Sequence, residues 1–272
     1  MTITGAVGRA SLAAARERLD AVIPSADLGR LGADLFAVLN LIDREHGVRR
    51  AVSDPSAAAD AKDALVRALL ENQISPAALG LVADVVRLRW SRPAELSDAL
   101  ENLAVTAEAA RAEAEGRVDD LEDELFRFSR VIEREHALRA ALVARNLPDD
   151  RKAAVLNDLL DGKVTAAALT LVTELVLRPR GRSLEGGLAE YGRLVAQRRQ
   201  RLVAVVRTPV DLSADQRTRL AGVLASAYGH QVHLNIEIDP STLGGLSVQI
   251  GDEIIDGTIA GRLDDVRRRL AG

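Results

Sequence analysis

Histidines beside acidic residues are the side chains of this sequence for which metal binding and proton transfer have to be considered. Glu45-His46 and Glu135-His136 each place a carboxylate next to an imidazole, and His230 and His233 lie three positions apart. Both side-chain types bind zinc and act as general acids and bases. Adjacent helix residues point about 100° apart, and neither pair has a second histidine at i+4. We therefore expect both pairs to have a structural role at a helix end, and His230 and His233 to be surface residues.

Glycines and aspartates near the C-terminus bring phosphate binding and paired-acid catalysis into consideration. Gly244, Gly245 and Gly251 do not form G-x-x-x-x-G-K-S/T or G-x-G-x-x-G, and no helix is expected directly after Gly245. Asp252 and Asp256 have no nucleophile, base or oxyanion site near them in the sequence. Turn formation and helix capping explain these residues. We predict no catalytic, cofactor-binding or metal-binding residue.

The elements that position these residues begin with a strand. Residues 232–238 alternate apolar and polar side chains, which is the period of a strand with one buried face. Asp239-Pro240 ends this strand, because proline lacks an amide hydrogen and disfavours helix in the residue before it. Gly244-Gly245 can adopt positive φ angles and favours a bend or a bulge. A second alternating run then includes Leu246, Val248 and Ile250.

The last part of the chain predicts a third strand and a helix. Gly251-Asp252 is a tight-turn dipeptide, and Ile254-Ile255 can pair back on the second strand. Asp256-Gly257-Thr258 leads into a helix over about residues 259–270. Upstream, residues 202–206 form a buried strand run, and Ser213 caps an amphipathic helix. Together these elements predict a small α/β domain.

The order of turn residues in this domain resembles one family. The segment is similar to the C-terminal domain of the delta subunit of bacterial F-type ATP synthases, known in mitochondria as the oligomycin-sensitivity-conferring protein. The family pattern is an acidic residue after a strand, two glycines, Gly-Asp after the next strand, a hydrophobic-Asp-Gly-Ser/Thr segment and Gly-Arg-Leu. The residues that fill it here, as family-motif structural residues, are Asp239, Gly244, Gly245, Gly251, Asp252, Asp256, Gly257, Gly261 and Arg262.

The sequence before this domain contains an internal repeat. Residues 34–86 align with residues 124–176 at a constant offset of 90 without a gap, and 19 of 53 positions are identical. The triplet Arg44-Glu45-His46 recurs as Arg134-Glu135-His136, in register with apolar positions at helical spacing. This pattern predicts a tandem repeat of one helical module. The repeated Phe36 and Phe126 are expected to lie in the core.

We therefore predict a mainly α fold with two tandem helical bundles and a small α/β C-terminal domain. The expected ranges are residues 1–100, 101–200 and 201–272. A helix over about residues 11–23 leads the first bundle. The matching element of the second lies within residues 101–115, in a long acidic and alanine-rich helix that is expected to link the bundles. Its charges are predicted to form a solvated face supported by i,i+4 pairs.

Composition excludes several classes of function. The 272 residues include no cysteine, which excludes disulfides and thiolate metal sites. A net charge of −4 lacks the strongly basic character of a nucleic-acid-binding protein. No segment approaches the roughly 20 apolar residues that cross a bilayer, and the N-terminus has no apolar secretory core, so we expect a soluble chain without direct membrane insertion.

The resemblance implies a function that depends on placement and not on chemistry. In the family, the helical bundle grips N-terminal helices of the alpha subunits of the catalytic head, and the C-terminal domain joins the b-type stalk subunit. Residues 101–272 match this arrangement, and residues 1–100 add a second bundle, as in actinobacterial forms. The implied protein is a non-catalytic stator subunit without cofactor, peripheral on the cytoplasmic face of the cell membrane.

Two other functions stay open from the residues alone. One is a helical-repeat adaptor for proteins unrelated to ATP synthase, which has no reason to reproduce the C-terminal motif. The other is a small enzyme built on the α/β domain, against which the missing catalytic groups count. The resemblance does not say which bundle copy grips the alpha subunits.

Overall fold

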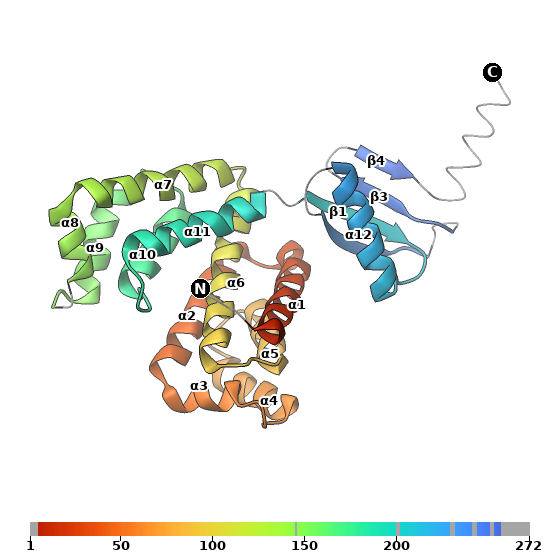
Figure 1. Cartoon of the computed structure of the whole chain (residues 1–272), viewed down its shortest axis with the longest axis horizontal. Coiled ribbons are helices and arrows are strands. Elements are labelled where there is room, and N and C mark those ends of the chain that lie inside the picture. The colour runs from red at the N-terminus through yellow and green to blue at the C-terminus, as the bar shows by residue number, and fades with distance from the viewer. Residues whose placement is uncertain are drawn as a thin grey trace, which may run out of the picture. The chain divides into compact units, whose positions relative to one another are not determined.

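Two compact units make up the chain, residues 1–198 and residues 199–272 (Figure 1). The structure is a computed structural model that describes residues 5–144, 146–199, 202–228, 232–240, 244–250 and 253–256. Twelve α-helices and four strands occur in these residues. The expected fold class, mainly α with a small α/β part at the C-terminus, is confirmed. No helix in the described ranges has the length and apolar character of a membrane span.

The N-terminal unit is entirely helical. Its elements are α1 (Ala6–Val22), a 3-10 turn η1 (Ile23–Ser25), α2 (Leu28–Arg44), α3 (His46–Ser53), α4 (Ala59–Leu70), α5 (Pro76–Arg87), α6 (Pro93–Ala114), α7 (Val118–Arg134), α8 (His136–Val143), α9 (Asp149–Leu160), α10 (Ala166–Leu177) and α11 (Leu184–Arg199). The helices α2 to α5 and α7 to α10 have the same lengths and the same 90-residue offset at both ends. The sequence repeat is therefore a structural repeat.

Equivalent polar contacts start corresponding helices in the two repeats. The Ser75 hydroxyl caps α5 and the Thr165 hydroxyl caps α10. The backbone N–H of each cap residue donates to a carboxylate on the equivalent helix of its repeat, Asp34 on α2 or Glu124 on α7, at 2.8 Å in both cases. N-caps of this kind satisfy backbone donors at the helix start. These contacts fix the positions of α5 and α10 in their repeats.

Helix α6 belongs to both repeats. It follows α5 as the last helix of the first repeat, and residues 96–112 within it are equivalent to α1 at the same offset. It packs along α2 and also contacts α1, α7 and α10. The boundary expected at residue 100 thus falls inside one continuous helix. The division of the chain into three domains stays a prediction.

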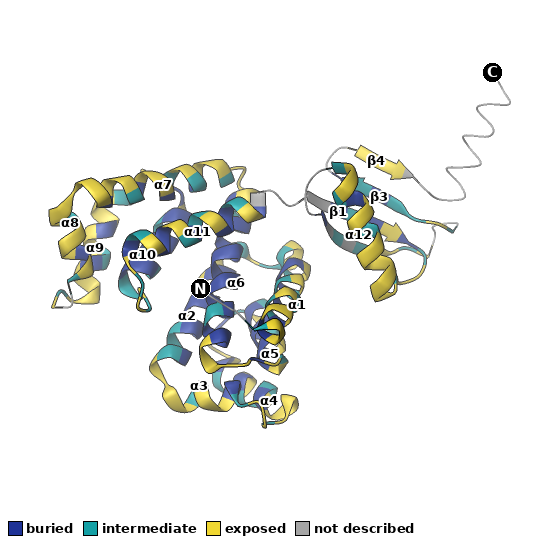
Figure 2. Cartoon of the chain, viewed as in Figure 1, coloured by how far each residue is buried: buried dark blue, intermediate teal, exposed yellow. Residues whose placement is uncertain are grey.

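The predicted solvated face of α6 is wrong. Figure 2 shows α6 buried over most of its length, and Glu95, Glu101 and Glu108 are 1%, 1% and 0% exposed. The reason is that helices of both repeats enclose α6, so its charged side chains meet protein groups and not water. Alanines along α6 allow this close approach, because Ala99, Ala104 and other small residues are fully buried.

Phe36 and Phe126 occupy equivalent positions but differ in burial. Phe36 is 2% exposed and lies in the core, as predicted, whereas Phe126 is 66% exposed, so the prediction for Phe126 is wrong. The two phenylalanines differ in burial because α6 packs along α2, whereas no helix of the described residues packs along α7 to the same extent. One hydrophobic core otherwise runs through both repeats.

The C-terminal unit is a four-stranded sheet with one described helix. Its elements are β1 (Leu202–Thr208), α12 (Ala214–Tyr228), β2 (Val232–Ile238), β3 (Ser247–Ile250) and β4 (Glu253–Asp256), and the strand order is β2-β1-β3-β4. The β1–β2 pair is parallel, and the other two pairs are antiparallel. Ala204 and Val206 of β1 pair with Ile250 and Val248 of β3, and all four are buried.

Helix α12 begins as the sequence predicts. The Ser213 hydroxyl accepts from the Gln216 N–H at 3.3 Å, and the Ser213 N–H donates to Gln216 Oε1 at 2.8 Å. This reciprocal pair is a capping box. The helix predicted over residues 259–270 lies outside the described residues.

Candidate helix-binding groove

An apolar groove of about 250 Å³ lies on the second repeat between α7, α9 and α10. Val131 of α7 and Leu159 of α9 line it and are 43% and 41% exposed. Phe128 forms a buried part of its wall. The remaining lining residues are Glu124, Arg127, Leu138, Leu160, Lys163, Val164, Ala168 and Val172. Covering such a surface with apolar side chains is favourable, because it removes apolar area from water.

Charged side chains at the groove are cationic where they are accessible. Arg127 pairs with Asp123 at 3.1 Å and remains largely exposed, and Lys163 donates to the Leu159 carbonyl at 2.9 Å. Glu124 is already engaged, since it accepts from the N–H and the hydroxyl of Thr165 at 2.8 and 2.7 Å. An amphipathic helix with an apolar ridge and acidic flanks fits an apolar groove with these charges.

The equivalent residues of the first repeat are less exposed to solvent. Leu70 and Ile74 are buried there, while their counterparts Leu160 and Val164 are half-buried. The difference follows from helix spacing, because α4 packs on α5 more closely than α9 packs on α10. The two repeats thus share a sequence pattern but present different surfaces.

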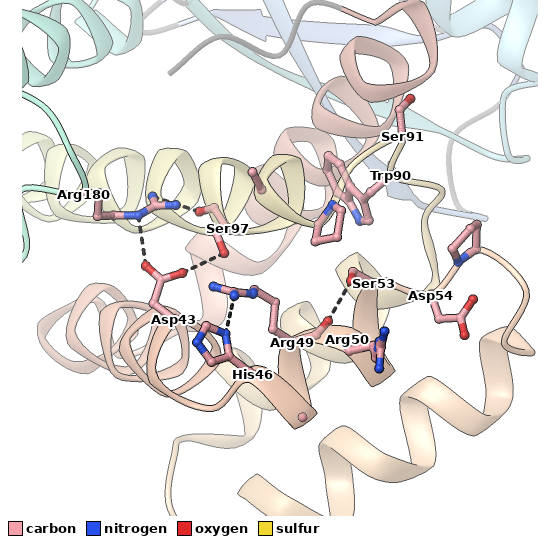
Figure 3. A pocket seen from close by; sticks show the side chains of 14 residues that line it. Asp43, His46, Arg49, Arg50, Ser53, Asp54, Trp90, Ser91, Ser97 and Arg180 are labelled. Atoms are coloured by element: carbon pink, nitrogen blue, oxygen red, sulfur yellow. Dashed lines mark hydrogen bonds and ion pairs between the residues drawn. The ribbon is translucent and has the colours of Figure 1, made fainter.

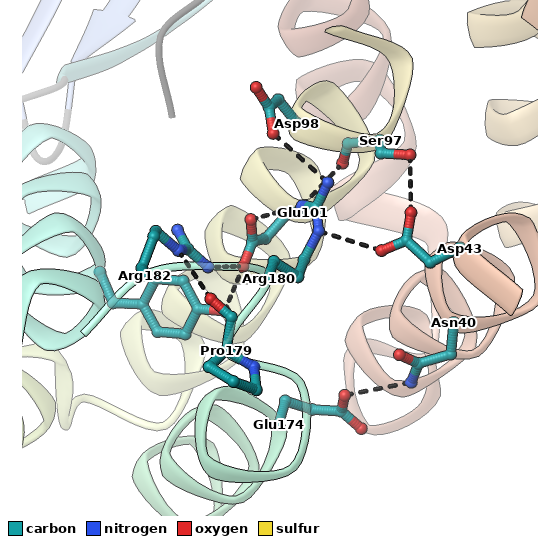
Figure 4. A network of polar contacts seen from close by, with 10 residues as sticks. Asn40, Asp43, Ser97, Asp98, Glu101, Glu174, Pro179, Arg180 and Arg182 are labelled. Atoms are coloured by element: carbon teal, nitrogen blue, oxygen red, sulfur yellow. Dashed lines mark hydrogen bonds and ion pairs between the residues drawn. The ribbon is translucent and has the colours of Figure 1, made fainter. Parts of the chain in front are cut away.

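A buried ionic network joins the two repeats (Figure 4). Glu101 of α6 accepts from Arg180 at 2.6 Å, from the Tyr191 hydroxyl at 2.7 Å, and from Arg182. Arg180 also pairs with Asp43 of α2 at 3.0 Å. Burial, and then Glu101, raise the pKa of Tyr191 well above its usual value, so the phenol remains a donor. The loop between α10 and α11 is thereby fixed to α6 and to α2 of the first repeat.

Two further contacts connect the repeats. The Asn40 amide of α2 donates to Glu174 of α10 at 3.1 Å, and burial raises the pKa of Glu174. Arg198 near the end of α11 pairs with Asp20 of α1 at 2.8 Å and with Glu113 of α6 at 2.9 Å. Buried charges of this kind have to be paired, because an isolated charge in a low-dielectric interior is costly. These contacts join α1, α2 and α6 to α10 and α11.

The described family-motif residues of the C-terminal unit lie at the ends of strands and in the connection from β2 to β3. The Asp239 N–H donates to the Thr208 carbonyl at 2.9 Å, beside the end of β1. Gly244 and Gly245 have φ angles of 65° and 83°, as predicted, in the connection from β2 to β3. Asp256 is the last residue of β4. Outside the described residues lie Gly251, Asp252, Gly257, Gly261 and Arg262. The assignment of all nine as motif residues stays a prediction.

The repeated histidines begin α3 and α8, where the sequence places them. The Nδ1 atom of His46 accepts from the Arg49 guanidinium. Within the described ranges, no cluster of three or more His, Cys, Asp or Glu side chains is suited to a metal ion. His230 lies outside these ranges, and the His233 side chain is not described.

Comparison with known proteins decides the family. The sequence profile described as "ATP synthase delta (OSCP) subunit" matches residues 103–270, which extend from the middle of α6 through the C-terminal unit. The chain belongs to this family. As a delta-family member it is a structural, non-catalytic subunit of the ATP synthase peripheral stalk.

Actinobacterial proteins that match this chain over nearly its whole length are named "ATP synthase subunit delta". "ATP synthase subunit delta" of Thermobifida fusca (strain YX) is 50% identical over 266 residues, 98% of this chain and 99% of the relative. The Streptomyces avermitilis protein of that name is 50% identical over 273 residues and 100% of both chains. A chain of the Toxoplasma gondii mitochondrial ATP synthase hexamer covers 62% of this chain and 95% of its own length, at 17% identity and a TM-score of 0.28, which is too distant to add to the argument.

The family profile and the actinobacterial relatives differ in whether they match the first repeat. It precedes the part of the chain that matches the delta-family profile, whereas the actinobacterial relatives span it. The duplicated bundle is thus common to this chain and those relatives, as the resemblance implied.

Proposed function

We propose that the helical unit holds the catalytic head through N-terminal helices of the alpha subunits, and that the C-terminal unit joins the b-type stalk subunit at the cytoplasmic face of the cell membrane. Family membership supports a stator role. The observation that carries the finer proposal is the open groove of the second repeat, with Val131 and Leu159 exposed beside cationic Arg127 and Lys163. An alpha-subunit helix would place its apolar ridge in this groove.

A stator joint requires slow dissociation and a stiff connection instead of catalysis. Several modest contacts made together dissociate much more slowly than one, because loss of a single contact leaves the others bound. The network around Glu101 and the pairs made by Arg198 couple the two repeats. A load taken up at the groove is therefore shared by the whole helical unit.

The test is isothermal titration of the full chain with a synthetic N-terminal helix of the alpha subunit from the same organism. The full chain is used because a shorter form starting near Glu101 would cut through α6. Val131→Asp and Leu159→Asp place a charge in the groove, and each is expected to raise Kd by about tenfold or more. Saturable binding to the wild-type chain supports the proposal.

The matched control is Val143→Asp on α8, which is also an exposed valine but does not line the groove. It is expected to change Kd by less than about twofold. Wild-type affinity in both groove variants would place the alpha-subunit helix elsewhere. A wild-type chain that does not bind the peptide would contradict the proposed contact with the head.

A further inference from the structure

A second pocket, of about 960 Å³, lies between α3, the start of α6 and the loop before α6, and Arg180 of the loop between α10 and α11 also lines it (Figure 3). Its lining includes the cationic side chains of Arg49, Arg50 and Arg180, the His46 ring and the buried Trp90. It shares no lining residue with the groove of the second repeat. The proposed contact with alpha-subunit helices does not involve it.

The carboxylates of this pocket are already engaged. Asp43 accepts from the Ser97 hydroxyl at 2.9 Å and pairs with Arg180 at 3.0 Å. Asp54 accepts from the N–H and hydroxyl of Ser56 at 2.8 and 2.6 Å, and these hydrogen bonds lower its pKa. Arg180 also pairs with Asp98 and Glu101, so its positive charge is shared by three carboxylates. Arg49, which donates to the His46 ring, and the exposed Arg50 have no carboxylate partner among the described residues.

The second repeat shows what occupies the equivalent position. Arg139, the fourth residue of α8, forms an ion pair with Glu185, the second residue of α11. Arg49 is likewise the fourth residue of α3, but the second residue of α6 is Ala94, which lines the pocket. The next residue, Glu95, is buried and accepts from the Ser91 N–H at 2.9 Å. The first repeat therefore has the arginine but lacks its carboxylate.

We propose that this pocket binds an acidic polypeptide segment, whose carboxylate side chain takes the place relative to Arg49 that Glu185 takes relative to Arg139. Arginine binds carboxylates through charge-assisted hydrogen bonds, and the neighbouring Arg50 adds a second cation for a second acidic residue. The occupant is a segment of a partner protein with at least two carboxylates. Charge complementarity selects it, because Arg49 and Arg50 line the pocket without a carboxylate partner among the described residues.

The pocket contains its own reporter. Trp90 is the single tryptophan of the chain and lines the pocket, so its fluorescence reports on charge brought near it. The full chain is titrated with a blocked hexaglutamate peptide at low salt, in parallel with hexaglutamine and with inorganic phosphate. We expect a saturable change with hexaglutamate and none with hexaglutamine. An equal response to both peptides would overturn the proposal, and a response that phosphate alone saturates would make the pocket a small-anion site instead.

Ala94→Glu is the decisive variant, because it supplies in the first repeat the carboxylate that the second repeat already has. Ala94 is exposed in the first turn of α6, where a negative charge is favourable, so the variant is expected to fold. It should weaken hexaglutamate binding by about tenfold or more, as should Arg49→Gln. Arg139→Gln is the matched control and should leave the Trp90 response unchanged. Undiminished binding in Ala94→Glu would contradict the proposal.

Discussion

Gly32 and Glu108 pack so closely that a Cβ atom on Gly32 would lie 2.8 Å from Cδ and 2.9 Å from Cγ of Glu108. The glycine of α2 thus makes room for a fully buried carboxyl group of α6. Neither oxygen of Glu108 has a hydrogen-bond partner, and its ion pair with Arg111 spans 3.7 Å. Burial raises the pKa of Glu108 to about 7.

Gly32→Ala tests this contact. The added methyl group forces Glu108 or α2 to move, and overpacking of this kind lowers the free energy of unfolding by about 1–3 kcal/mol. Gly80→Ala in α5 is the control, since nothing lies within 4 Å of its added Cβ. That change should raise stability by about 0.5–1 kcal/mol through helix propensity. Urea unfolding of both variants measures the difference, and equal effects would show that α2 and α6 are not in tight contact.

The raised pKa of Glu108 predicts how stability depends on pH. The folded chain holds this proton up to about pH 7, while the unfolded chain releases it near pH 4.5. The folded state is therefore most stable below the pKa that Glu108 has in the unfolded chain, and this stability is lost as the pH rises towards the pKa that Glu108 has in the folded chain. Glu108→Gln removes this loss. Its advantage over the wild type should grow from under about 1 kcal/mol near pH 5 to about 3 kcal/mol at pH 8. An advantage independent of pH would contradict the titration of Glu108.

Arg180→Ala tests the network between the repeats. It leaves Glu101 and Asp43 without the cation that bridges them, and breaking a buried pair in this way costs about 3–5 kcal/mol. Arg193→Ala is the control, because Arg193 pairs with Glu190 at the surface, and its loss should cost less than about 1 kcal/mol. Denaturant unfolding followed by circular dichroism measures both. Similar small losses would mean that the network does not couple the repeats.

The two repeated phenylalanines predict opposite outcomes for one substitution. Phe36→Ala should lower the free energy of unfolding by about 3–5 kcal/mol, because it opens a cavity in the core of the helical unit. Phe126→Ala should change it by less than about 0.5 kcal/mol, because that side chain is exposed. Thermal unfolding of the two variants at one pH is sufficient. A large loss at Phe126 would mean that α7 is covered in solution.

Features set by local sequence were predictable. The positive φ angles of Gly244 and Gly245, the cap at Ser213, and the helices of both repeats follow from turn chemistry, capping and apolar spacing. These depend on neighbours a few positions away in the chain.

Features set by distant partners were not predictable. The alanine-rich pattern of α6 does not reveal that Arg180 and Arg182, about 80 residues later, surround Glu101. Helical spacing in the sequence marks Val155 and Leu159 as apolar positions of α9, but their exposure depends on how closely α9 packs on α10. In both cases helix packing, which a single sequence does not encode locally, determines whether a side chain meets water.

The sharing of α6 has a mechanical consequence. Two bundles joined by a loop would bend at that loop under load, and the compliance of the joint would add to that of each bundle. Because α6 is the last helix of one bundle and the first of the next, no flexible loop connects the two bundles. The second bundle therefore extends the helical unit, and the continuous α6 helix resists bending between the bundles.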